Sequence, residues 1–229
     1  TECHKLIQAA ASPRLALIYK TLIATGMRES ELIGLQWRMI DWEHGQINLT
    51  SQLKWLRDEK RWERLPLKNR KRRLIPLDAT LIDELRAHQN RQHTEQYTAG
   101  DTWQDNDLVF ATASGAPYIG RNLINYLQRD TGVAKIGKIT VHELRHTAGS
   151  LLLQAGKTMT TVSKILGHSS VGVTDKIYRM RSMRTSARRY RRSPDCYRQC
   201  PKRRPIEQKP HKPSVATKTR NLGDRDSAF

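Results

Sequence analysis

The spacing of apolar residues changes along this chain, and that change constrains the fold more than any other feature. Before residue 26 and after residue 120, apolar side chains recur with the period of a helix. Between residues 45 and 77 the apolar runs are short and strand-like: QINLT, RWERLPL and RRLIPL. These patterns predict an α+β fold that is mostly α-helical, with a small antiparallel β-sheet near the N-terminal third.

Residues that begin and end helices refine this prediction. Ser12 followed by Pro13 begins a helix that Gly26 ends, and a second helix follows from Arg28. Further helices are predicted over residues 78–92, 121–129, 141–154, 160–166 and 173–181. The polar residues 93–107 are expected to form a loop that leads to a short strand at residues 108–111.

The 229 residues carry a formal net charge of +19 at pH 7, and most of this excess lies near the C-terminus. Residues 179–229 contain 16 Lys and Arg against 4 Asp and Glu, with almost no apolar periodicity after residue 183. We therefore expect residues 1–183 to fold as one domain and residues 184–229 to form a basic, disordered tail. This charge indicates an anionic partner, most simply nucleic acid.

Other features of the sequence exclude two classes of protein. No apolar run is long enough to span a membrane, so we expect no membrane partner. Three cysteines cannot form a disulfide framework, and the N-terminal residues lack the pattern of a signal peptide. We therefore expect a cytoplasmic protein.

The segment TGMRESEL at residues 25–32 places Arg28 just after a helix-ending glycine and before acidic residues that begin the next helix. A guanidinium at such a junction can face a cleft and bind a phosphate through two parallel hydrogen bonds. The alternative is a solvated surface arginine paired with Glu29 or Glu31, and this segment alone favours that alternative.

Basic residues, Lys68 and Lys71 among them, crowd the connection between two predicted strands at residues 67–77, LKNRKRRLIPL. One interpretation is a basic hairpin that reaches into a DNA groove, and the other is a solvated run of charge. The position between strands rather than in a tail favours a functional interpretation.

The segment VHELRHTAG at residues 141–149 could be interpreted as a metal-binding site. HELRH matches H-E-x-x-H, the zinc-protease helix in which two histidines bind the metal and the glutamate is the base. A third ligand is missing, because Leu152 stands where the extended motif has His and no Glu occurs from residue 144 to residue 206. A zinc metallohydrolase using residues 142–146 is therefore a distant alternative, and we expect no metal and no cofactor.

A phosphate site explains the same segment better. His142 and Arg145 are three residues apart, so they are neighbours on one helix face. Arg145 supplies a fixed charge, and His142 supplies a proton donor or acceptor near neutral pH. Downstream, His168 follows Gly167 at a predicted helix end, and Tyr178 lies ten residues later on the last predicted helix.

In this order the segments resemble the catalytic domain of the tyrosine recombinase (phage integrase) family. The matching pieces, within about residues 10–182, are TGMRESELIGLQW, KNRKRRLIPL, HELRHTAGSLLLQAG and LGHSSVGVTDKIY. The resemblance implies the catalytic fold of DNA breaking-rejoining enzymes. It assigns catalytic roles to six residues: Arg28, Lys68, His142, Arg145, His168 and Tyr178. Lys71 is the alternative to Lys68.

The resemblance also implies an activity, which is site-specific recombination or integration of double-stranded DNA by a homo-tetramer, without a metal or other cofactor. Tyr178 would attack the phosphodiester and form a 3′-phosphotyrosine, with His142 as proton acceptor. Arg28 and Arg145 would bind the non-bridging oxygens, helped by a hydrogen bond from His168, and Lys68 would protonate the leaving 5′-oxygen.

Two features depart from the family. Its members carry a separate helical DNA-binding domain before this one, and we expect that domain to be absent here. Residues 184–229 also do not resemble the segment that follows the nucleophile in the family and docks on a neighbouring protomer. The main alternative is therefore a truncated integrase remnant that binds DNA without completing recombination.

Overall fold

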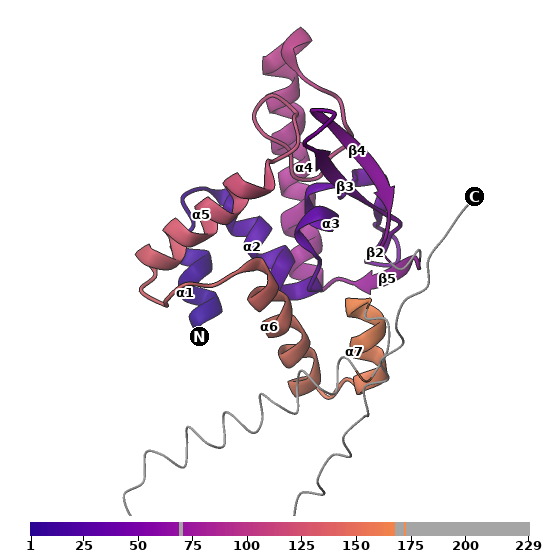
Figure 1. The fold of residues 1–229 in the computed structure, drawn as a ribbon, viewed down its shortest axis with the longest axis vertical. Coiled ribbons are helices and arrows are strands. Elements are labelled where there is room, and N and C mark those ends of the chain that lie inside the picture. The colour runs from indigo at the N-terminus through magenta and orange to yellow at the C-terminus, as the bar shows by residue number, and fades with distance from the viewer. Residues whose placement is uncertain (69–70, 168–171, 173–229) are drawn as a thin grey trace, which may run out of the picture. The chain divides into compact units, whose positions relative to one another are not determined.

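The computed structural model describes residues 1–68, 71–167 and 172 (Figure 1). The first long helix begins and ends where the sequence predicts. The Ser12 hydroxyl accepts a hydrogen bond from the Leu15 backbone N–H at 3.2 Å, and Pro13 occupies the first helical position. Gly26, with φ 61°, ends the helix in the left-handed conformation that glycine adopts without strain.

In the described part of the chain helices come first, short strands follow one another up to residue 76, and helices make up the rest. The α-helices are α1 (Glu2–Gln8), α2 (Pro13–Thr25), α3 (Glu29–Ile33), α4 (Ala79–Ala99), α5 (Gly120–Val133), α6 (Val141–Gln154) and α7 (Met159–Leu166). The strands are β1 (Ile40–Asp41), β2 (Gln46–Leu49), β3 (Ser51–Leu56), β4 (Arg61–Pro66) and β5 (Arg73–Pro76). Short 3₁₀ turns lie at Trp37–Met39 and Gly100–Thr102.

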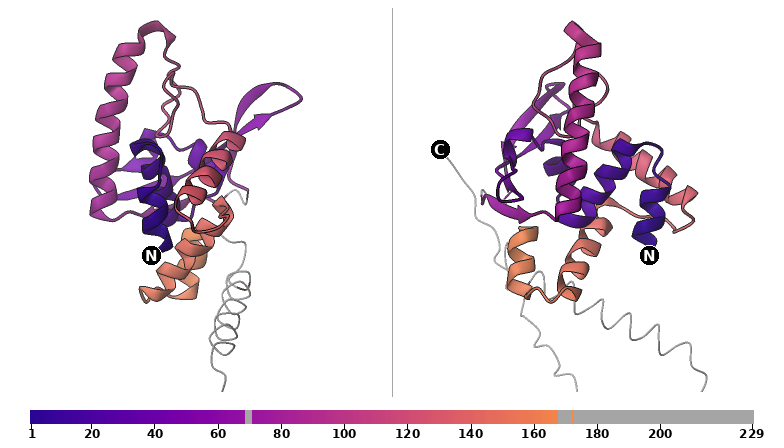
Figure 2. Two further views of the ribbon diagram at one scale, coloured as in Figure 1. Left: turned by 90° about the vertical axis from the view of Figure 1, so that its left-hand side faces the viewer. Right: turned by 180° about the vertical axis from the view of Figure 1, so that it is seen from behind.

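The strands form two small antiparallel sheets, which confirms the predicted fold class. One sheet has the order β1-β2-β5, with Ile47 opposite Ile75, and the other is the pair β3-β4, with Trp55 opposite Trp62. The two tryptophan rings pack edge to face, with their centroids 5.3 Å apart. The β3-β4 ribbon projects from the body of the domain (Figure 2).

The predicted pairing around the basic connection is wrong. Strand β4 pairs with β3 and strand β5 pairs with β2, so the basic residues between β4 and β5 link two sheets and do not form a hairpin turn. Strand β3 was not predicted, although Gln52, Leu53, Lys54 and Trp55 alternate between polar and apolar as in a half-buried strand. Its pairing with β4 leaves β5 to complete the other sheet.

Helix α2 organises the core. It contacts α1, α4 and α6, and its Tyr19 and Leu22 are fully buried. The Tyr19 hydroxyl donates to Asp130 Oδ2 of α5 at 2.8 Å. Burial of the Tyr19 hydroxyl, together with the adjacent Asp130 carboxylate, raises the pKa of Tyr19. This interaction fixes α5 against α2.

Several predicted boundaries need correction. The helix expected to end at residue 92 continues to Ala99, because nothing breaks it before Gly100. Helix α3 is short and ends at Ile33, before Gly34, which packs so closely on β3 that a Cβ there would lie 2.5 Å from the Leu53 backbone nitrogen. Residues 108–111 form two isolated bridges instead of a strand, and α1 was not predicted. The predicted helix at residues 173–181 and the tail lie outside the described residues.

Within the described ranges, no helix is long and apolar enough to cross a membrane.

Candidate functional site

Arg28 lies where α2 ends and α3 begins. A Cβ at Gly26 would come within 2.4 Å of Leu166 Cδ2, so only glycine lets this turn pack so closely on the end of α7. From the turn, Arg28 Nη1 donates to Glu31 Oε1 at 2.8 Å, and Nη2 donates to the Gly167 carbonyl oxygen at 3.2 Å. The Arg28 side chain is 30% exposed. Arg28 is therefore paired with Glu31, as the interpretation of a surface arginine expected, and it is also accessible, as a phosphate site requires.

Glu31 is a buried carboxylate shared by two arginines. It accepts from the Arg28 backbone N–H at 2.8 Å, and from Arg73 Nη1 at 3.1 Å and Nη2 at 2.6 Å. Burial raises the pKa of the Glu31 carboxyl, but the hydrogen bonds and charge of Arg73, with those of Arg28, outweigh burial and hold that pKa below its usual range. Of the two acids that the sequence offered as partners of Arg28, the structure pairs it with Glu31. Burial raises the pKa of the other acid, Glu29.

A cleft of about 430 Å³ opens beside Arg28. Its lining includes four uncharged residues, Leu67, Leu74, Ser163 and Gly167. The others are basic: Arg28, Lys68, Lys71, Arg72, Arg73 and Lys164. We call this the basic cleft. Among the described residues that line it there is no carboxylate, so it suits an anion. The structure thus brings Arg28 and Lys68 together, and it places Lys71 in the same cleft.

The C-terminal end of α7 gathers three arginines from three different segments. The last carbonyl groups of a helix have no partner within the helix and carry partial negative charge. Here the Ile165 carbonyl oxygen accepts from Arg73 Nε at 2.8 Å, that of Leu166 accepts from an Nη of Arg145, and that of Gly167 accepts from Arg28. Three consecutive carbonyl groups therefore position three guanidinium groups next to the residue that precedes His168. We call these three carbonyl groups the α7 terminus.

Helix α6 begins where the sequence predicts and carries His142 and Arg145. The Thr140 hydroxyl accepts from the Glu143 backbone N–H, and the Glu143 carboxylate accepts from the Thr140 N–H, which closes a capping box. Arg145 is 4% exposed, and its Nη1 also donates to the Gly26 carbonyl oxygen at 2.5 Å. It therefore joins the end of α2 to the end of α7.

His142 is exposed, and its ring lies edge to face against His146, with the centroids 4.3 Å apart. Neither His142 nor Arg145 is among the residues that line the basic cleft. Two further predicted site residues, His168 and Tyr178, lie outside the described residues. Of the six predicted site residues, the structure thus places Arg28 and Lys68 in the cleft and ties buried Arg145 to the α7 terminus.

The sequence-based prediction missed Arg73. It stands in a run of cations in which no member looks different from its neighbours. The period of the strand is the signal that could have identified it. Arg73 lies two residues before the fully buried Ile75, on the same face of β5, whereas Leu74 between them is 55% exposed. The pattern therefore predicts that Arg73 points inward.

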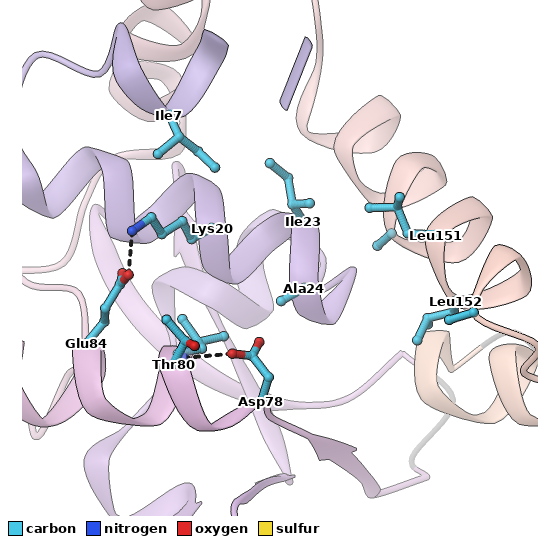
Figure 3. Close-up of a pocket in the computed structure, with 12 residues that line it drawn as sticks. Ile7, Lys20, Ile23, Ala24, Asp78, Thr80, Glu84, Leu151 and Leu152 are labelled. Carbon is cyan, nitrogen blue, oxygen red and sulfur yellow. Dashed lines mark hydrogen bonds and ion pairs between the residues drawn. The ribbon is translucent and has the colours of Figure 1, made fainter. Parts of the chain in front are cut away.

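A second hollow, of about 480 Å³, is mostly apolar (Figure 3). It lies between α2 and α6, with α1 and the start of α4 at its edges, and we call it the apolar groove. Ile23 and Ala24 of α2 face Leu151 and Leu152 of α6, and Lys20 pairs with Glu84 at the edge, 2.5 Å apart. None of the predicted site residues that the structure describes lines it.

The zinc alternative finds no support in the part of the chain that the structure describes. Three or more His, Cys, Asp or Glu side chains do not come together there in a way that could hold a metal ion. The rings of His142 and His146 lie edge to face, and among the described residues they are not part of such a group of three.

The comparisons with known proteins identify the family. The model of the phage integrase family matches residues 1–184, so this chain belongs to that family. A tyrosine recombinase XerC-like protein of Caldanaerobacter subterraneus subsp. tengcongensis is 31% identical over 189 residues, which cover 77% of this chain and 48% of that protein. An integrase of Streptomyces ambofaciens is 33% identical over 111 residues, covering 47% of this chain and 29% of that protein. The chain thus spans about half or less of the length of these relatives.

Solved structures show the same fold. The XerA recombinase matches with a TM-score of 0.62 and 26% identity, covering 82% of this chain and 63% of that one. The Tn1549 transposon integrase, in complex with transposon right end DNA, matches with a TM-score of 0.63 and 20% identity, covering 81% of this chain and 62% of that one. The fold predicted from the resemblance, that of tyrosine recombinase catalytic domains, is confirmed.

Proposed function

We propose that this chain catalyses site-specific recombination of double-stranded DNA by breaking and rejoining strands through Tyr178. The observation that carries the proposal is the α7 terminus, where three arginines meet at the edge of the basic cleft just before His168. Family membership supports the same function, since relatives of this chain are named recombinases and integrases.

The proposed first step is a phosphoryl transfer between two oxygens. The Tyr178 hydroxyl attacks the scissile phosphorus and transfers its proton to His142. The bond from phosphorus to the 5′-oxygen breaks, and Lys68 protonates that oxygen, so that a 3′-phosphotyrosine and a free 5′-hydroxyl result. A 5′-hydroxyl from another strand reverses the step and rejoins the DNA. The enzyme therefore needs no external source of energy.

The arginines stabilise the charge that builds on the non-bridging oxygens. We assign this role to Arg28 and Arg145, with a hydrogen bond from His168. Arg28 has the accessible guanidinium in the wall of the cleft. The bonds from Arg145 to the Gly26 and Leu166 carbonyl oxygens fix its side chain against the turn that leads to His168.

Double-stranded DNA is the proposed partner, and its phosphates suit the positive charge of the cleft. Two of the structural neighbours were solved in complexes with DNA, the Tn1549 integrase and the XerH recombinase on its difH substrate. We propose that residues 1–183 form the catalytic domain, that residues 184–229 add sequence-independent affinity for DNA, and that four copies act together on DNA in the bacterial cytoplasm.

The test is covalent trapping on DNA. Duplexes that bind the full chain are selected from a randomised pool and given a nick near the candidate cleavage position, so that the cleaved fragment diffuses away and the adduct accumulates. We expect an SDS-resistant adduct with the wild-type chain and none with Tyr178→Phe, because phenylalanine has no nucleophilic oxygen. Tyr97→Phe is the matched control, since Tyr97 is 90% exposed on α4.

Two outcomes would contradict parts of the proposal. An adduct with Tyr178→Phe would show that another residue is the nucleophile. No adduct with the wild-type chain on any selected duplex, despite measurable binding, would instead identify a remnant that binds DNA without completing recombination.

A further inference from the structure

Arg73 carries a positive charge on a side chain that is almost completely buried. It is the first residue of β5 and directly follows the basic residues of the connection from β4. Its side chain is only 8% exposed, although Arg72 and Leu74 on either side are exposed. Burying a cation is costly unless it is paired and hydrogen-bonded, so this arrangement needs a compensating partner.

The guanidinium of Arg73 uses all three of its nitrogens inside the protein. Nη1 and Nη2 form a fork on the two oxygens of Glu31, at 3.1 and 2.6 Å, and Nε donates to the Ile165 carbonyl oxygen at 2.8 Å. This bidentate geometry is specific to arginine, because a lysine ammonium can reach only part of it.

These contacts tie together three segments that carry site residues. Through Glu31, Arg73 holds the start of α3, and the same carboxylate accepts two hydrogen bonds from Arg28. Through Ile165 it holds the α7 terminus. Through the backbone of β5 it holds one end of the connection that carries Lys68.

We propose that Arg73 is a positioning residue, which sets Arg28, the connection with Lys68 and the α7 terminus in the geometry that strand cleavage requires. The inference rests on the proposed function and adds a residue to it. Arg73 does not contact the phosphate in this role. It acts through Glu31 on Arg28, so its loss should slow the chemical step more than it weakens DNA binding.

The experiment separates binding from chemistry. The single-turnover rate of adduct formation is measured at saturating nicked duplex for the wild-type chain, Arg73→Lys, Arg28→Lys and the double variant, and the Kd for the same duplex is measured separately. We expect Arg73→Lys to slow cleavage roughly 10- to 100-fold while the Kd changes by less than about threefold, because the charge is kept. In the Arg28→Lys background, Arg73→Lys should add less than about threefold, because coupled residues are not additive.

The matched control is Arg86→Lys, which makes the same chemical change at an exposed arginine of α4 whose nearest acid, Asp83, lies 3.9 Å away. Wild-type cleavage by Arg73→Lys, or full additivity with Arg28→Lys, would overturn the inference. If Arg73→Lys does not fold at the assay temperature, its single-turnover rate and that of the wild-type chain are compared at a lower temperature at which circular dichroism shows both folded. A slower rate at saturating DNA would support the inference, and an unchanged rate would overturn it. Failure of the wild-type chain to form any adduct would overturn the proposed function itself, which is a separate result.

Discussion

The basic cleft and the apolar groove are hollows of similar size, about 430 and 480 Å³, with opposite chemistry. The groove is lined mostly by aliphatic side chains of neighbouring helices, with paired charges such as Lys20 and Glu84 at its edge, and such contacts stabilise a fold without directing a reaction. The cleft gathers cations from the start of α3, from β5, from α7 and from the connection between the sheets, and its Arg28 and Arg73 are held by the Glu31 carboxylate and by carbonyl groups of the α7 terminus. Volume therefore does not distinguish the two hollows. What distinguishes them is the positive charge of the lining and the protein's own groups that balance it.

The largest expected effect is that of Arg145→Lys. Lysine keeps the charge but loses the fork that reaches both the Gly26 and the Leu166 carbonyl oxygens. We expect adduct formation to fall roughly 100- to 1000-fold. Because the carbonyl groups lose a charged donor, we also expect the free energy of unfolding to fall by about 2–4 kcal/mol.

Adduct assays and thermal melts of Arg145→Lys measure the two effects separately. Cleavage at the wild-type rate would show that geometry is not what Arg145 contributes. An unchanged melting temperature would show that its buried hydrogen bonds do not stabilise the fold.

The next effect distinguishes Lys68 from Lys71, which line the same cleft. If Lys68 protonates the leaving oxygen, Lys68→Ala should slow cleavage roughly 100-fold. A duplex in which sulfur replaces the bridging 5′-oxygen needs no proton donor, since a thiolate leaves readily at neutral pH, and should restore the rate to within about tenfold. Arg28→Ala is the control that sulfur should not rescue. Rescue of Lys71→Ala alone would assign the proton donor to Lys71.

Protonation of His88, which does not line the basic cleft, should lower the stability of the fold without changing the cleft. Burial, together with the positive charge of Arg14 and Arg91, lowers the pKa of His88 to about 4, even though its hydrogen bond to the Val109 carbonyl raises it. The unfolded chain binds a proton on this residue near pH 6.5, so folding is favoured most above that pH. Stability falls as the pH drops from about 6.5 to 4, by about 2–3 kcal/mol.

Urea unfolding of the wild-type chain and of His88→Gln at several pH values measures this effect. The difference in unfolding free energy between the two chains should shrink as the pH falls through that window. A constant difference would show that His88 does not carry the dependence.

The smallest effect on cleavage is expected from a substitution in the apolar groove. It tests whether the groove, unlike the basic cleft, contributes to stability alone. Leu152→Ala should lower the free energy of unfolding by about 1–2 kcal/mol, since Leu152 is partly buried against the core. The single-turnover rate of adduct formation, measured well below the melting temperature, should stay within about twofold of wild type. A large loss of cleavage would show that the groove takes part in the reaction.

Helix α6 shows how far the sequence could predict this molecule. Its start at Val141 and its end at Gln154 follow from the apolar period and the Thr140 cap, which are local properties. The position of Arg28 in a cleft did not follow from its own segment, which favoured a solvated arginine. Only the order of all the segments, and the family resemblance that this order carries, placed Arg28 in the site.

The pairing of the strands and the role of Arg73 could not be predicted in the same way. Strand β3 pairs with β4, the next strand in the chain, whereas β5 pairs with β2, which lies much earlier in the chain. The period of β5 places Arg73 on the buried face, but its contact with Glu31, far away in the chain, is not contained in that period. The β2–β5 pairing and the Arg73–Glu31 contact are long-range properties, which single-sequence periodicity does not report.

The three carbonyl groups at the end of α7 have a consequence for how the site meets its ligand. Cations brought this close repel one another, so a site of this kind would open in the absence of an anion unless the protein supplied negative charge of its own. The end of the α7 dipole and the Glu31 carboxylate supply it here. The entropy of ordering the arginines is therefore lost during folding, and the free chain is pre-organised for a phosphate. High salt should then weaken DNA capture without loosening the arrangement of the arginines, since exposed charges are screened and buried ones are not.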